Sequence, residues 1–152
     1  MMKKTWLASI ILCAVACLSI HAQELVTGPP ADTALTPVMS YALVGPYAGQ
    51  EFDSAKEIGD APGGFLFIHE LSRNTAPMIT GFDQLAGEYG LLGFKGFTLL
   101  LADDRTAAER RLKAVNGSLR LRNPIVLSLD GAEGPGNYAL NRKCTLSLIL
   151  TK

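Results

Sequence analysis

The sequence predicts an α/β domain in which helices cover the faces of a mainly parallel sheet. Two continuous apolar runs, Phe65–Ile68 and Phe97–Leu101, are typical of strands that are buried on both faces. A segment with helical spacing of its apolar residues follows each run. Strands that alternate with helices predict βαβ crossovers, which place successive strands side by side and parallel.

The N-terminus has the features of a secretory signal peptide over residues 1–22. Lys3 and Lys4 give it a positive start, the run from Trp6 to Ile20 is uncharged and apolar, and Ala22 supplies a small residue for cleavage. We therefore expect cleavage after Ala22 and export to the periplasm or the exterior. The apolar run is shorter than the roughly 20 residues of a membrane span. An uncleaved anchor and a lipid on Cys17 are the alternatives, and either would bring the protein to a membrane.

Charge and soft-ligand content exclude several classes of function. The 14 Lys and Arg residues balance the 14 Asp and Glu residues, so no electrostatic argument favours nucleic acid. Cleavage removes Cys13 and Cys17, which leaves Cys144 as the one cysteine and His69 as the one histidine. An intramolecular disulfide is then excluded, and a metal cluster has too few ligands. We predict neither a metal nor a cofactor.

The first half of the mature chain begins with a flexible lead-in over residues 23–37, rich in Pro and Thr, and a domain over 38–152 follows it. Tyr41–Val44 is expected to be the first strand and Phe65–Ile68 the next. A helix then starts near Pro77 and ends at Gly90. Its apolar residues recur every three or four positions, at Met78, Phe82, Leu85, Ala86 and Tyr89.

In the second half, strand Phe97–Leu101 leads to a helix that should start at a capping box. Thr106 is the expected N-cap, Glu109 lies three residues later, and Gly117 is expected to end the helix. Asn116-Gly117-Ser118 also fits a glycosylation acceptor, which matters only in a glycosylating host. Two further strands are predicted, over 125–129 and 145–151.

The segment from Phe65 to Tyr89 resembles the strand, active-site turn and long helix of the thioredoxin fold. From Leu127 to Leu150 the chain resembles the redoxin branch of that superfamily, in which an Asp-Gly loop and a Tyr step precede a Thr-containing strand. The resemblance covers about residues 38–152. It implies a three-layer thioredoxin-like sandwich. It also implies that the family's last strand and closing helix are missing after Lys152.

The redox motif of that superfamily is absent. Where thioredoxins carry Cys-x-x-Cys, this chain has Ser72, Arg73, Asn74 and Thr75. Where the family usually places a proline before the Thr of the later strand, it has Cys144 followed by Thr145. Hydroxyls form no disulfide and have no accessible anion near neutral pH, so the resemblance implies a redox-silent domain.

Three hypotheses of function follow. The first is a binding or scaffold module without enzymatic activity, which holds a protein partner at the turn of Ser72–Thr75 or at the exposed edge of the last strand. His69 and Glu70 lie at the same edge and are further candidate binding residues. The second is a thiol oxidoreductase or oxidant sensor that uses Cys144, with Ser72 and Thr75 as its hydrogen-bond partners. The third is a truncated redoxin fragment without function.

Overall fold

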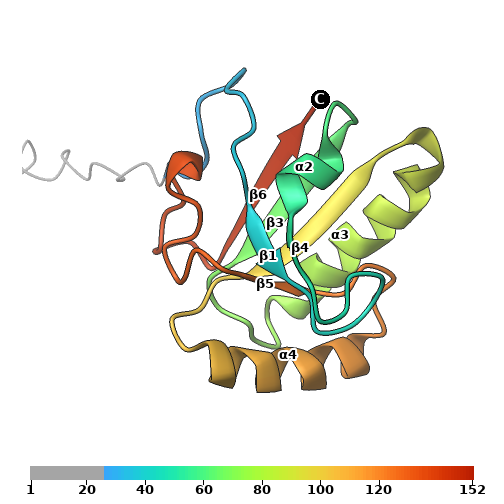
Figure 1. Cartoon of the computed structure of the whole chain (residues 1–152), viewed down its shortest axis with the longest axis vertical. Helices are drawn as coiled ribbons and strands as arrows, with labels where there is room; N and C mark the ends of the chain where they lie inside the picture. Colours follow the sequence, from blue (N-terminus) through green and yellow to red (C-terminus); the bar gives the residue numbers. More distant parts are fainter. Residues whose placement is uncertain (1–25) are drawn as a thin grey trace, which may run out of the picture.

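A computed structural model describes residues 26–152 of the chain (Figure 1). The predicted signal peptide, with Cys13, Cys17 and its cleavage site, lies outside the described residues. Over 26–152, no helix combines the length and the apolar character that a membrane crossing requires.

The domain is built on one six-stranded sheet with the order β2-β1-β5-β4-β3-β6. Strands β3, β4 and β5 are parallel to one another, whereas β1 pairs antiparallel with both β2 and β5, and β6 pairs antiparallel with β3. Three of the five strand pairings are therefore antiparallel, and the prediction of a mainly parallel sheet was wrong. The strands are β1 Met39–Tyr41, β2 Glu51–Asp53, β3 Gly63–Ile68, β4 Lys95–Leu100, β5 Val126–Ser128 and β6 Leu146–Thr151.

The connections explain the strand directions. A parallel neighbour needs a crossover that carries the chain back along the sheet, and α3 (Ala76–Tyr89) and α4 (Arg105–Leu119) provide the two crossovers between β3, β4 and β5. Between β5 and β6 there is only a short 3-10 turn, η2 (Gly136–Tyr138). The chain therefore stays at the edge where β5 ends, and β6 has to run back antiparallel to β3.

Two apolar cores lie on opposite faces of the sheet because side chains alternate along each strand. Phe65 and Phe67 of β3 enter the core that is covered by α2 (Ser54–Ile58) and η2. Leu66 and Ile68 enter the core under α3 and α4. All six residues of β3 are buried, which confirms that its apolar run is a strand buried on both faces.

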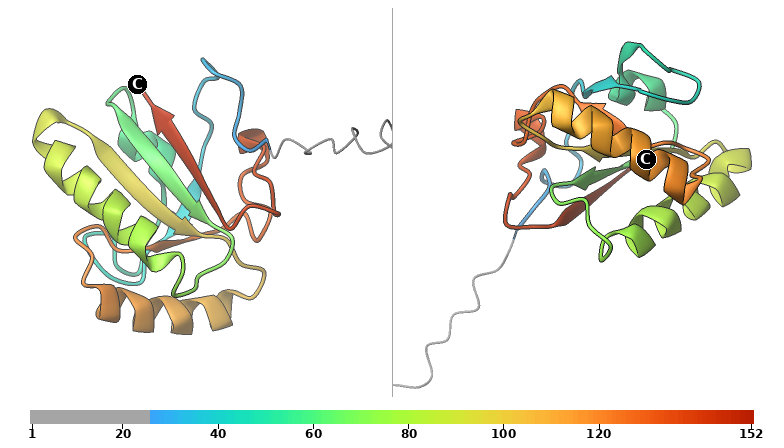
Figure 2. Two further views of the ribbon diagram at one scale, coloured as in Figure 1. Left: turned by 180° about the vertical axis from the view of Figure 1, so that it is seen from behind. Right: turned by 90° about the horizontal axis from the view of Figure 1, so that it is seen from below.

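Helix α3 buries only part of the predicted apolar face. Ile79, Phe82 and Ala86 are buried, but Met78 and Leu85 are largely exposed. These two lie on a side of α3 that the rest of the domain leaves uncovered. Figure 2 shows α3 beside β4 and β3, with no helix in front of β6. This side of α3 therefore has no layer to pack against.

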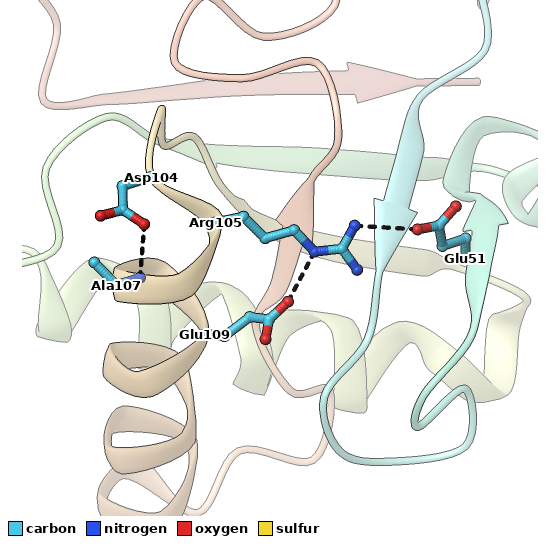
Figure 3. Close-up of polar contacts among 5 residues, drawn as sticks. All are labelled: Glu51, Asp104, Arg105, Ala107 and Glu109. Carbon is cyan, nitrogen blue, oxygen red and sulfur yellow. Dashed lines mark hydrogen bonds and ion pairs between the residues drawn. The ribbon is translucent and has the colours of Figure 1, made fainter.

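Helix α4 starts earlier and ends later than its sequence predicts. Asp104, not Thr106, is the N-cap, since its carboxylate accepts a hydrogen bond of 2.9 Å from the backbone of Ala107 (Figure 3). The helix continues through Gly117 to Leu119, because Leu119 still packs against the core.

Arg105 links the start of α4 to the hairpin of β1 and β2 through an ion pair. Its guanidinium contacts Glu109 at 2.8 Å and Glu51 of β2 at 3.2 Å (Figure 3). All three side chains are substantially exposed, so the pairs position the helix end more than they stabilise the fold.

The lead-in lies against the domain from residue 27 onward. Thr27 and Ser147 share a hydroxyl–hydroxyl hydrogen bond of 2.9 Å, and the Tyr138 hydroxyl donates to the Thr36 carbonyl at 2.8 Å. These contacts place the lead-in beside β6 and η2, while its flexibility stays a prediction.

Candidate functional site

The turn of Ser72–Thr75, where the resemblance would place a dithiol, connects β3 to α3. The Thr75 hydroxyl accepts a hydrogen bond from the Ser72 backbone N–H at 3.0 Å and donates to the Ser72 carbonyl at 2.9 Å. Thr75 is buried, Ser72 is half-buried, and Arg73 and Asn74 are exposed. The Thr75 hydroxyl is thus occupied within the turn, and the side chains of Arg73 and Asn74 are the ones presented to solvent.

Cys144 comes just before a residue that pairs with the segment leading into this turn. The Thr145 carbonyl, one residue later, accepts hydrogen bonds from the backbones of His69 at 3.0 Å and Glu70 at 3.3 Å. Cys144 itself is a free, half-buried thiol whose N–H donates to the Asn141 carbonyl at 2.8 Å. The structure therefore brings His69, Glu70, Cys144 and Thr145 to one edge of the sheet. Over residues 26–152, no hydrogen bond joins the Cys144 thiol to Ser72 or Thr75.

His69 is the one titratable group of this edge that is enclosed without a partner. Its Nε2 is buried and has no hydrogen-bond partner among the described residues. Burial lowers the pKa of His69, and the nearby Arg142 lowers that pKa further, while Glu133 opposes the shift. The lowered pKa favours the neutral imidazole at pH 7.

The loops around His69 are tied together by charged residues that sequence reasoning did not single out as a site. Arg142 forms ion pairs with Glu133 and, at 3.6 Å, with Asp103. Asp103 also accepts a hydrogen bond of 3.4 Å from the Ala132 backbone. The signal in the sequence is the position of Asp103 in the loop that follows the buried end of β4.

Among the described residues, this edge holds no cluster of metal ligands. In the part of the chain that the structure describes, no three His, Cys, Asp or Glu residues lie close enough to hold a metal ion. The acids Asp103 and Glu133 are exposed and are already paired with Arg142. Ion pairs of Arg142 therefore join the loops at this edge, which also carries the His69 imidazole and the half-buried Cys144 thiol.

Comparison with known proteins identifies the fold. No protein-family model matches the sequence, and no curated protein matches it. A hypothetical protein from Sinorhizobium meliloti 1021 is similar in structure, with a TM-score of 0.57 at 15% identity over 83% of this chain. An uncharacterized conserved protein from Geobacillus kaustophilus has a TM-score of 0.55 at 13% identity over 84% of it. This chain spans 64% of the length of each of those two.

A third similar structure supports the same fold. It is the solution structure of a "putative protein disulfide isomerase" from Bacteroides thetaiotaomicron. The TM-score is 0.63 at 11% identity, and the match covers 83% of this chain and 76% of that one. The described domain therefore has a thioredoxin-like α/β fold, as the resemblance implied. At such identities the similarity concerns the fold and not the activity.

Proposed function

We propose that this chain is an exported, redox-silent binding module of the redoxin branch of the thioredoxin-like superfamily. The observation that carries the proposal is the turn between β3 and α3. Its two positions for sulfur hold Ser72 and Thr75, and the Thr75 hydroxyl is engaged with the Ser72 backbone on both its donor and acceptor sides.

The chemistry of disulfide exchange supports this choice over an enzyme. A thiolate attacks the substrate disulfide, and a second thiol must then attack the mixed disulfide to release the reduced product. Cys144 could supply the first thiol only, so the mixed disulfide would stay on the protein. Cys144 also precedes β6 and is not part of the turn of Ser72–Thr75 that leads into α3. The protein therefore lacks the second thiol that would resolve the mixed disulfide and complete a cycle of disulfide reduction.

Restoring the two thiols should create the missing activity. The double variant Ser72→Cys/Thr75→Cys places one half-buried and one buried sulfur at the start of α3, and we expect it to form an intramolecular disulfide. Insulin reduction in the presence of dithiothreitol, corrected for the uncatalysed rate, should be absent in the wild type and measurable in the double variant.

The single variant Ser72→Cys is the matched control and should stay inactive, since it has no resolving thiol in the turn. The proposal is wrong if the wild type reduces insulin and loses that activity in Cys144→Ser.

The binding surface that the geometry favours is the outer edge of β6. Because the Thr145 carbonyl pairs with His69, alternation along the ladder directs the backbone groups of Leu146, Leu148 and Leu150 away from β3. The side chains of Leu148 and Leu150 are 51% and 64% exposed on the α3 face. An edge with unpaired backbone groups and exposed leucines is a template for an added strand.

The partner that we propose for this edge is a second copy of the chain. An antiparallel pairing centred on Leu148 sets Leu148 opposite Leu148 of the partner subunit and Leu146 opposite Leu150 of the partner subunit. In that register the outward backbone groups face one another, and β6 contains no charged residue to oppose the contact. A two-fold contact of this kind is self-complementary.

Leu148→Lys should dissociate the pair. Like charges directly opposite one another destabilise strand pairing, and here the two lysines would meet at the two-fold axis. Sedimentation velocity should show dimers of the wild type and monomers of the variant, with unchanged circular dichroism. Leu92→Lys, at an apolar position that is 76% exposed in η1 (Gly90–Leu92), is the control and should remain dimeric. A wild type that is monomeric at every concentration would refute the pairing.

A further inference from the structure

A cavity of about 480 Å³ opens at the end of the sheet opposite the turn of Ser72–Thr75. It lies where β4 and β5 begin, between the end of α3, the loop before β5 and the loop between β1 and β2. Its volume falls within the roughly 300–1,000 Å³ of small-molecule pockets. The sequence reading placed no site here.

Aromatic rings form one wall of the cavity. Tyr47 and Phe52 are stacked, with ring centroids 4.3 Å apart, and Phe97 lies 5.9 Å from Phe52. These rings and Phe94 are only half-buried, so part of their apolar surface remains open to the cavity. A wall of this kind favours an alkyl or aromatic body.

Two cations line the same cavity without an ion pair. Arg122 and Lys95 form no salt bridge to a carboxylate among residues 26–152, and the Lys95 ammonium donates instead to the Glu57 carbonyl. The Arg122 guanidinium lies against α3 at Gly87, where a Cβ atom would overlap it. Buried Asp83 fixes the backbone beneath it, because its carboxylate accepts hydrogen bonds from the N–H groups of Arg122 at 3.0 Å and Asn123 at 2.8 Å.

One acid, Glu57, lines the same cavity. The Glu57 carboxylate accepts a hydrogen bond of 2.6 Å from the Tyr47 hydroxyl, which holds it on the aromatic wall. With Arg122, Lys95 and Glu57 charged, the lining carries a net charge of +1. The two cations therefore favour a ligand with a negative charge.

We propose that this cavity binds an amphipathic monoanion, namely a free carboxylate with an alkyl or aromatic body. The body lies against Tyr47, Phe52 and Phe97, and the carboxylate pairs with the Arg122 guanidinium, whose planar fork matches its two oxygens. This site is independent of the β6 edge and of any thiol chemistry.

The test uses decanoate below its micelle concentration, with decanol as the uncharged analogue of the same body. Isothermal titration calorimetry should show decanoate binding to the purified protein, and Arg122→Gln should weaken it about tenfold, or about 1.4 kcal/mol. Decanol binding should be the same in both proteins. Arg110→Gln removes an exposed cation of α4 outside the cavity and should bind decanoate like the wild type.

The position of bound decanoate is measured separately from its affinity. In amide NMR spectra, decanoate should shift the resonances of Gly96 and Asn123, which line the cavity, and leave those of His69 and Glu70 unchanged. The inference fails if decanoate does not bind, if the shifts lie outside the cavity, or if Arg122→Gln binds as tightly as Arg110→Gln. Such a failure would leave the reductase and sedimentation results unaffected.

Discussion

Phe65→Ala is expected to lower the free energy of unfolding by about 3–5 kcal/mol. Phe65 is fully buried in β3, a strand with a neighbour on each side. Its ring lies 5.7 Å from that of Phe67, 6.5 Å from that of Phe97 and, edge to face, 5.8 Å from that of Tyr138. Truncation removes the centre of this aromatic cluster and leaves a cavity that the rigid sheet cannot close.

Urea unfolding followed by circular dichroism measures this loss. Leu92→Ala is the matched control, because it removes an exposed apolar side chain and should change stability by no more than about 0.5 kcal/mol. Equal losses in the two variants would mean that the aromatic cluster does not carry the stability that its burial implies.

Asn116→Ala should cost about 3 kcal/mol through lost hydrogen bonds. Asn116 is buried in α4, and its side chain bonds both backbone groups of Ile125, accepting from the N–H at 2.9 Å and donating to the carbonyl at 3.0 Å. Alanine would leave these two buried groups of Ile125 without partners. The same contacts make Asn116-Gly117-Ser118 inaccessible to glycosylation in the folded protein, because the side-chain amide of Asn116 that would carry the glycan is buried.

Two further variants separate the hydrogen bonds from the general effect of substitution. Asn137→Ala changes an exposed asparagine in η2 and should be nearly neutral. Asn116→Asp keeps the acceptor for the Ile125 N–H but sets an oxygen against the Ile125 carbonyl, so it should also destabilise the fold. Unfolding curves of Asn116→Asp that match the wild type would contradict the assigned bonding.

Local patterns were sufficient for the central elements. The continuous apolar run Phe65–Ile68 is buried throughout in β3. The run that starts at Phe97 lies in β4, which is exposed at its start and buried at its end. The helical spacing after Pro77 and the stop at Gly90 place α3 correctly at Ala76–Tyr89. Periodicity succeeds here because burial and backbone type both depend on residues that are close in sequence.

Other features required the tertiary structure. Asp104 caps α4 in place of Thr106, although both are good capping residues, because the position where the chain leaves β4 decides which of them enters the helix. The same limit applies to the site: the turn of Ser72–Thr75 could be located from the resemblance, but its closed hydrogen bonding could not.

The sequence by itself determined the central strand–helix alternation, the thioredoxin-like resemblance and the absence of a second thiol from residues 23–152. The tertiary structure decided the direction of β6, the face that α3 buries and the meeting of Arg122 with an aromatic wall. These depend on which distant segments pack together and from which edge the chain returns. A local pattern records that a side chain is apolar or charged, but not what lies across from it.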